Sequence, residues 1–224
     1  MSGPKLVGVI PLNTLDRTKT RLSSVLTPEA RRALTRWLAG RTLRALYASG
    51  VVERIAVVSP DPEALAWAEA HGAEPLLQPG RGLNVGLALG RAWATRLEAE
   101  ALLIALGDLP LLTDDEIRRF VAMGRLHPRL VTLAPDRADE GTNLMLARPP
   151  ELAPLAYGRG SFKRHRALAR RANVPTLIFS VPGAAFDVDH PADLEEIIAA
   201  GLWQPRPTPT PSGLRPPSLE RGRT

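Results

Sequence analysis

The feature that most constrains the fold is a regular alternation of short apolar runs with helix-forming segments over the first 120 residues. Four apolar runs of the buried-strand type are each followed, after a short connection, by a segment with helix signals. This alternation is typical of a mostly parallel β-sheet with helices on both faces, because a parallel strand needs a crossover connection. The expected strands are Leu6–Ile10, Ile55–Val58, Pro75–Leu77 and Ala101–Leu106, and the expected helices begin at Pro28, Pro62, Leu87 and after Thr113.

A different pattern follows in the second half of the chain. Leu130–Ala134 and Asn143–Ala147 are short apolar runs joined by a charged, glycine-containing loop, which predicts a hairpin instead of a crossover. Ser161–Arg171 is expected to be a helix, Leu177–Val181 a strand and Pro191–Ala200 a final helix. The sequence therefore predicts an α/β fold with helices on both faces of a mostly parallel sheet and a hairpin insertion.

The last part of the chain has a separate character. Residues 204–224 contain six prolines and show no apolar periodicity, which is typical of a disordered, proline-rich tail. Residues 1–203 are expected to form a single domain. About half of the net charge of +6 lies in the tail, and the remainder shows no arginine run interleaved with aromatic residues, so nucleic-acid binding is not expected.

Composition excludes several kinds of site. The chain has no cysteine, which rules out disulfides, thiolate metal sites and cysteine nucleophiles, and its four histidines are too scattered for a zinc site. The first apolar run, Leu6–Leu12, is too short to span a membrane and lacks the layout of a signal peptide. We therefore expect no membrane association and a cytoplasmic location.

Ligands of such sheets bind at the carboxyl ends of the strands, so residues just after the strands are the candidates for chemistry. Lys19 and Arg21 follow the first strand in a polar segment and could bind phosphates. Because no glycine lies between Gly8 and Gly40, neither a P-loop nor a dinucleotide fingerprint is present, and side chains would do the binding. The alternative is a solvated loop.

Acidic residues follow two other strands. Asp108 comes after the most hydrophobic strand, while Asp187 and Asp189 would face the same side of an extended segment. Carboxylates in such places suit a divalent cation such as Mg²⁺. Asp108 could instead start a turn, and Asp189 could be the N-cap of the final helix, so both alternatives stay open.

A candidate anion site lies in the second half. The glycine-rich loop that ends at Gly160 places Ser161 at the start of a predicted helix, followed by Lys163, Arg164 and His165. A helix N-terminus with free amides, a hydroxyl cap and nearby cations binds anions readily. An ordinary cap after a flexible loop is the alternative.

Taken in order, these motifs resemble those of the 2-phospho-L-lactate or phosphoenolpyruvate guanylyltransferases of coenzyme F420 biosynthesis, from Val7 to about Gly201. The resemblance rests on Lys19–Leu22, Val57–Asp61, Gly82–Asn84, Gly107–Thr113, Ala134–Arg137, Gly141–Asn143, Gly158–Phe162 and Asp187–Pro191. The stretch GDLPLLT at Gly107–Thr113 is common among nucleotidyltransferases, whereas its combination with GTN, GRGSF and DVDHP is much more specific.

The resemblance implies a nucleotide-diphospho-sugar transferase (GT-A type) fold and transfer of GMP from GTP to the phosphate of a three-carbon acid, with release of diphosphate. It also implies a role for each motif residue, all named by their numbers in this sequence. The Mg²⁺ ligands would be Asp108 and Asp189, and the acid would be contacted by Thr142, Gly158 and Ser161. The GTP phosphates would be faced by Lys19 and Arg21, which with Asp108 would serve catalysis. The residues near the nucleoside would be Ser59, Pro60, Asp61 and Asn84. No general base is required, since a phosphate monoester is already a nucleophile at neutral pH.

One departure and several alternatives accompany the resemblance. Asn13-Thr14 stands where the family often has Lys-Pro, which removes a potential phosphate contact. A molybdopterin guanylyltransferase would have a glycine-rich first loop, and a glycosyltransferase would have a second acidic residue where Pro110 stands. A non-catalytic nucleotide-binding regulator would release no diphosphate. The expected partners are GTP, the phospho-acid and a downstream F420-pathway transferase, with a homodimer as an option.

Overall fold

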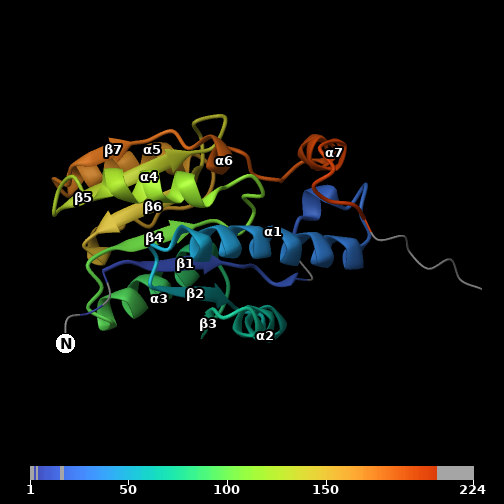
Figure 1. Ribbon diagram of the computed structural model, residues 1–224, viewed down its shortest axis with the longest axis horizontal. Helices are drawn as coiled ribbons and strands as arrows, with labels where there is room; N and C mark the ends of the chain where they lie inside the picture. The colour runs from blue at the N-terminus through green and yellow to red at the C-terminus, as the bar shows by residue number, and fades with distance from the viewer. Residues whose placement is uncertain (1–2, 4, 16–17, 206–224) are drawn as a thin grey trace, which may run out of the picture.

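The computed structural model describes residues 3, 5–15 and 18–205. The tail that the sequence predicts to be disordered lies, from residue 206 onward, outside the described residues. Seven strands form one sheet in the order β3-β2-β1-β4-β6-β5-β7 (Figure 1). The strands are β1 (Val7–Pro11), β2 (Arg54–Ser59), β3 (Glu74–Leu77), β4 (Leu102–Ala105), β5 (Leu130–Pro135), β6 (Thr142–Arg148) and β7 (Thr176–Ile178). The predicted α/β fold is confirmed.

The two halves of the sheet are built differently. β1 pairs in parallel with β2 and β4, and β2 with β3. β5 and β6 form the expected antiparallel pair, but β6 lies inside the sheet, where it also runs antiparallel to β4. Because β6 runs backwards, its first residues lie at the same edge as the last residues of β1, β2 and β4.

Helices cover both faces of the sheet, and most of them begin where the sequence predicts. They are α1 (Pro28–Ser49), α2 (Pro62–Ala70), α3 (Leu83–Arg96), α4 (Asp114–Gly124), α5 (Ser161–Arg171), α6 (Pro182–Ala185) and α7 (Pro191–Ala199). One apolar core joins α1, α2, α4 and α6 to one face, a second joins α3 and α5 to the other, and a third packs α7 against the first half of α1. Side-chain caps at Thr27, Asp61 and Thr113 fix the starts of α1, α2 and α4.

Two expected boundaries were wrong. α3 begins at Leu83 instead of Leu87, so Asn84 lies in the first turn of a helix and not in a loop. The strand expected over Leu177–Val181 ends at Ile178, because the chain turns into the short helix α6 at Pro182, whose fixed φ suits a first helical turn.

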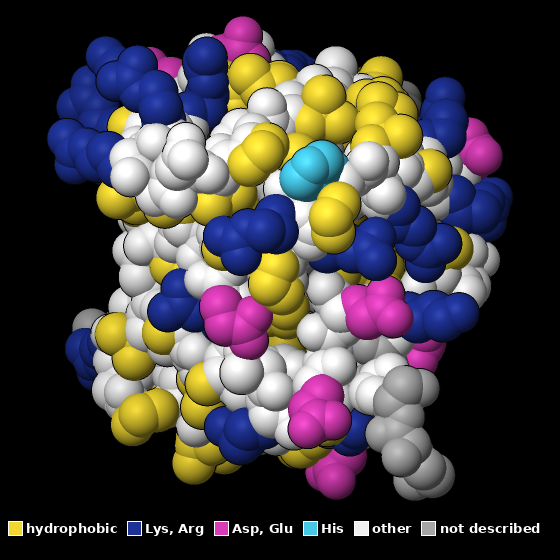
Figure 2. Space-filling model, turned by 90° about the vertical axis from the view of Figure 1, so that its left-hand side faces the viewer, with side chains coloured by type: hydrophobic (Ala, Val, Ile, Leu, Met, Phe, Trp, Pro, Cys, Tyr) yellow, Lys and Arg dark blue, Asp and Glu magenta, His cyan; other side chains and the backbone are white. Residues whose placement is uncertain are grey.

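The face at the amino ends of the parallel strands is remote from the predicted site. Figure 2 shows basic side chains gathered in one upper corner of this face, and acidic and basic side chains interspersed over the remainder. None of the helices in the described part of the chain is long and apolar enough to cross a membrane.

Candidate active site

A cleft of about 450 Å³ opens at the carboxyl ends of β1, β2 and β4. Five of the sequence-predicted residues line it, namely Lys19, Arg21, Pro60, Asp108 and Asp189. The other lining residues are Pro11, Leu12, Asn13, Thr18, Thr20, Thr35, Gln78, Gly82, Leu83, Leu106 and Gly107. The cleft therefore combines charged groups from both ends of the chain.

Asp108 follows β4 and lies in this cleft, and the chain before it packs closely against the end of β1. A Cβ atom at Gly107 would lie 2.6 Å from Leu12 Cδ2, so only glycine fits without a shift. The backbone carbonyl of Asp108 then accepts a hydrogen bond from the N–H of Val188, at 3.4 Å. This bond ties the end of β4 to the segment that carries the other two acids.

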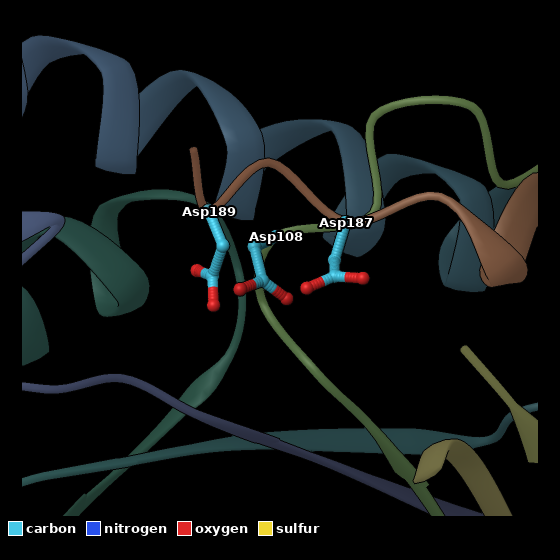
Figure 3. Close-up of side chains that lie close together, drawn as sticks. All are labelled: Asp108, Asp187 and Asp189. Carbon is cyan, nitrogen blue, oxygen red and sulfur yellow. The ribbon is translucent and has the colours of Figure 1, made fainter. Parts of the chain in front are cut away.

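Three carboxylates meet where these segments touch. Asp108, Asp187 and Asp189 each offer one oxygen, and these oxygens lie within 4.8 Å of one another. Figure 3 shows the three side chains in a row, with Asp108 between the two others and all three pointing the same way. Val188 is fully buried in the core with α1 and α7, so its two neighbours in this extended segment point to the opposite side.

Lys19 is the counterion of this acidic cluster. Its Nζ donates to Asp108 Oδ2 at 2.7 Å and to Asp189 Oδ1 at 2.9 Å, and its side chain is only 9% exposed. Burial by itself would lower the pKa of Lys19, but the charges and hydrogen bonds of Asp108 and Asp189 outweigh it and raise that pKa. The residue adopts a left-handed backbone conformation, with φ +48°, which is uncommon for a non-glycine residue and is found at functional sites.

Arg21 reaches the same cluster from the surface. Its guanidinium donates to Asp189 Oδ2 at 3.1 Å and lies 3.4 Å from His190 Nε2. Both oxygens of Asp189 thus face cations, and Asp189 is not the N-cap of α7. The N-cap is His190, and Asp193 in the first turn of α7 accepts the N–H groups of Asp189 and His190. Of the two alternatives for Asp189, the capping one is wrong.

The environment drives the pKa values of Asp187 and Asp189 apart. Burial, together with the charges of Asp108 and Asp189, raises the pKa of Asp187 to about 6. For Asp189, burial would also raise the pKa, but Lys19 and Arg21 lower it below its ordinary value. Sequence reasoning placed Asp187 on the correct side but did not include it among the metal ligands. The Asp-Val-Asp spacing was the signal for it.

A divalent cation fits this donor set. Asp108 Oδ1 is buried and has no hydrogen-bond partner among the described residues, which is costly for a carboxylate oxygen. Carboxylate oxygens from Asp108, Asp187 and Asp189 converge within reach of one ion. These three residues could hold a metal.

Of the residues predicted to lie near the nucleoside, some line the cleft and others hold its wall in place. Pro60 lines the cleft, whereas Ser59 is fully buried and its hydroxyl accepts the N–H of Asp61 at 3.1 Å. Asp61 caps α2 and also accepts the N–H of Leu15, at 2.8 Å, which ties the segment after β1 to the segment after β2. Ser59 and Asp61 therefore hold the wall of the cleft.

The side chain of Asn84 contacts the loop before α5. Its side-chain oxygen accepts the N–H of Tyr157 at 2.8 Å, and its amide donates to the Tyr157 carbonyl at 3.1 Å. Asn84 therefore clamps the loop before α5 to the start of α3. Both of its polar atoms are engaged with protein backbone.

The three residues assigned to the acid substrate lie together beyond the cleft lining, around the start of β6 and of α5. Thr142 is buried, and its Oγ1 lies 3.0 Å from His165 Nδ1. Gly158 lies in the loop clamped by Asn84, and Ser161 is the first residue of α5 and is also buried.

The expected anion site at the start of α5 needs correction. Gly160, with φ +67°, is the N-cap, so Ser161 provides no hydroxyl cap. The amides of Ser161, Phe162 and Arg164 donate to the carbonyls of Gly158, Glu140 and Gly160, respectively, so these amides are not free. His165 is fully buried and is not a surface cation.

A β-bulge in β6 lies between the acidic cluster and the residues assigned to the acid substrate. Ala134 pairs with Leu144 and Pro135 with Thr142, so Asn143 has no partner on β5. Thr142 then faces His165 on α5, while Asn143 donates to the carbonyl of Ala184 at 2.8 Å and to Asp187 Oδ1 at 3.4 Å. Sequence reasoning missed the roles of Asn143 and His165, because neither lies at the end of a parallel strand.

Comparison with known proteins identifies the family. Residues 6–204 match the family described as guanylyl transferase CofC like. The chain belongs to this family. It is 49% identical over 191 residues to the phosphoenolpyruvate guanylyltransferase of Sphaerobacter thermophilus, covering 85% of this chain and 91% of that protein. It is 40% identical over 199 residues to the phosphoenolpyruvate guanylyltransferase of Rubrobacter xylanophilus, covering 89% and 96%.

Solved structures support the same assignment at the level of the fold. A protein from Desulfovibrio desulfuricans described as a nucleotide-diphospho-sugar transferase superimposes with a TM-score of 0.69 at 18% identity, covering 88% of this chain and 87% of that one. A 4-diphosphocytidyl-2C-methyl-D-erythritol synthase gives 0.63 at 14% identity, covering 88% and 98%. The predicted nucleotide-diphospho-sugar transferase-like fold is confirmed, and this member of the CofC-like family is a nucleotidyltransferase.

Proposed function

We propose that this enzyme transfers GMP from GTP to phosphoenolpyruvate, releases diphosphate and serves coenzyme F420 biosynthesis in the cytoplasm. Two curated relatives that cover most of the chain are named phosphoenolpyruvate guanylyltransferase, and they support this acceptor over 2-phospho-L-lactate or 3-phosphoglycerate. The observation that carries the proposal for this chain is the acidic cluster beside Lys19 and Arg21 in the cleft. The product, a diphosphate-linked nucleotide, would pass to a downstream F420-pathway transferase, and the enzyme could act as a homodimer.

The residues of the cleft suit the demands of the reaction. A phosphate oxygen of the acceptor attacks the α-phosphorus of GTP, the bond from that phosphorus to the bridging oxygen breaks, and diphosphate leaves with the electron pair. Both reactants are polyanions, so the barrier comes largely from bringing negative charges together. Mg²⁺ bound by Asp108, Asp189 and Asp187 would compensate charge on the nucleotide phosphates. Lys19 and Arg21 would hold the phosphates in line.

The nucleotide and the phospho-acid would approach Asp108, Asp187 and Asp189 from different directions. Pro60 and the wall supported by Ser59 and Asp61 would receive the nucleoside, and Asn84 would hold the loop that separates it from the acceptor. Thr142, Gly158 and Ser161 would bind the phospho-acid. Asn143 lies between these groups, because it contacts Asp187 and directly follows Thr142.

The decisive experiment is a diphosphate-release assay on the full chain with GTP and Mg²⁺. The three acids phosphoenolpyruvate, 2-phospho-L-lactate and 3-phosphoglycerate are supplied in turn, and ATP, CTP and UTP replace GTP as controls. We expect release with GTP and phosphoenolpyruvate above all other pairs. Release that does not depend on any of the acids, or no release at all, would favour a different acceptor or a nucleotide-binding regulator and overturn the proposal.

A further inference from the structure

His165 occupies an unusual position for a histidine in the core. It lies on α5 with no exposed surface, and its ring meets the ring of Tyr157 edge to face, with centroids 4.6 Å apart. One of its ring nitrogens contacts the loop before α5 and the other contacts the first residue of β6. Nε2 lies 3.2 Å from the backbone nitrogen of Ala156, and Nδ1 lies 3.0 Å from Thr142 Oγ1.

These two contacts determine where the protons are. A backbone N–H can only donate, so His165 Nε2 must accept from Ala156 and carries no proton. The neutral ring then carries its proton on Nδ1, which donates to Thr142 Oγ1. Burial and the charge of Arg164 lower the pKa of His165 to about 4, in agreement with a neutral ring at physiological pH.

The consequence for Thr142 follows from the chemistry of a hydroxyl group. Thr142 Oγ1 accepts the Nδ1–H of His165, so its own proton is directed away from the ring. The bulge at Asn143 sets this hydroxyl on the α5 side of the sheet, next to the residue that contacts Asp187. The O–H of Thr142 is thus available to donate to a group other than His165.

Resting on the proposed function, we propose that His165 is the positioning residue of the acceptor site, and that its Nδ1–H tautomer orients the Thr142 hydroxyl to donate to the phospho-acid. The loop that carries Gly158 depends less on His165, because Asn84 binds both backbone groups of Tyr157 and Arg164 binds the carbonyl of Ala156. The contact with Thr142 is therefore the one that matters for the acceptor.

Two substitutions separate the two contacts of the ring. His165→Asn places an amide donor near the position of Nδ1 and loses the acceptor for Ala156 N–H. His165→Gln places an oxygen near the position of Nε2 and loses the donor to Thr142. We expect H165N to keep the KM for phosphoenolpyruvate within about threefold of wild type, and H165Q to raise it about tenfold, the effect of one lost hydrogen bond to a bound substrate.

Stability should follow the opposite order. H165N leaves a buried backbone N–H unpaired and should have the lower melting temperature of the two variants. If His165 only filled the core, the variant with the lower melting temperature would also have the higher KM, and it would have it for both substrates. The KM for GTP should stay within about twofold in both variants.

The double variant tests whether His165 acts through Thr142. Thr142→Val removes the hydroxyl, so H165Q combined with T142V should have the same acceptor KM as T142V alone. Additive effects, or an acceptor KM unchanged in H165Q, would overturn the role of His165. So would a ¹⁵N NMR spectrum of the imidazole that shows the proton on Nε2.

The controls keep this inference distinct from the proposed function. If the wild-type enzyme releases no diphosphate with any of the three acids, the proposed function fails. If it turns over and only the ordering of H165N and H165Q is wrong, the proposed function stands and the role of His165 falls.

Discussion

Two polar clusters lie on opposite sides of the start of β6, and they solve the problem of burying polar groups in opposite ways. On one side, Asp108, Asp187 and Asp189 share Lys19 as a counterion, and one buried carboxylate oxygen is left without a partner among the described residues. On the other, His165 is neutral and both of its ring nitrogens are hydrogen-bonded. The difference teaches that the charged cluster leaves a carboxylate oxygen open to a further partner, whereas the neutral cluster satisfies its own ring nitrogens.

The largest effect should come from removing charge at the centre of the acidic cluster. Asp108→Asn should lower the rate of diphosphate release on the order of 10³-fold at saturating Mg²⁺, because in the proposed mechanism it would remove a metal ligand beside the reacting phosphates. Asp115→Asn, on the exposed first turn of α4, removes the same charge outside the cleft and serves as the control. A D108N enzyme with near wild-type turnover would show that Asp108 only starts a turn.

The next test asks whether Lys19 neutralises the acidic cluster when no metal is bound. Lys19→Met should lower turnover on the order of 10²-fold, because in the proposed mechanism a cation that binds the phosphates would be lost. Without that internal counterion, Mg²⁺ alone should raise the melting temperature of K19M by about 3 °C more than that of wild type. The comparison is made by calorimetry with and without Mg²⁺, and Lys5→Met at the far edge is the matched control. Equal shifts in K19M and wild type would contradict the counterion role.

The two clusters should respond to pH with opposite signs. The folded-state pKa of Asp187 is raised to about 6, so its contribution to stability is present below about pH 4 and is lost as the pH rises through 6. The folded-state pKa of His165 is lowered to about 4, so its contribution is present above about pH 6.5 and is lost as the pH falls towards 4, by on the order of 3 kcal/mol.

Urea unfolding in a metal chelator between pH 4 and 7 measures both trends. Relative to wild type, Asp187→Asn should gain stability as the pH rises from 4 to 7. His165→Asn should be least stable relative to wild type near pH 7, and the difference should shrink as the pH falls. Trends of the same sign in the two variants would show that the clusters do not differ in the way described.

The smallest effect should come from the hydroxyl at the start of α5. Ser161→Ala should raise the KM for the phospho-acid about fivefold and leave the KM for GTP unchanged, because the side chain lies in the acceptor group and away from the cleft lining. Steady-state kinetics with each substrate varied in turn provides the measurement. Loss confined to GTP would place Ser161 on the nucleotide side.

The sequence predicted the parallel half of the fold and the residues that end its strands. The strands and helix caps from β1 to α4 are local features, so Lys19, Asp108 and the first turn of α4 could be located from spacing alone. The position of β6 inside the sheet and the bulge at Asn143 depend on long-range pairing, which leaves no local signal. For this reason the contacts made by Asn84 and His165 could not be predicted, although His165 lies in a helix that was correctly assigned.

The reversed direction of β6 has a consequence for how enzymes of this kind can diversify. Pro135 and Thr142 bound a loop that lies at the site edge but belongs to no parallel crossover, and Asp136 holds it through the amides of Ala138, Glu140 and Gly141. Insertions or deletions there leave the register of β1, β2 and β4 unchanged. Under the proposed function, changes in this loop would alter the surroundings of Thr142 without moving the strands that carry the proposed nucleotide site.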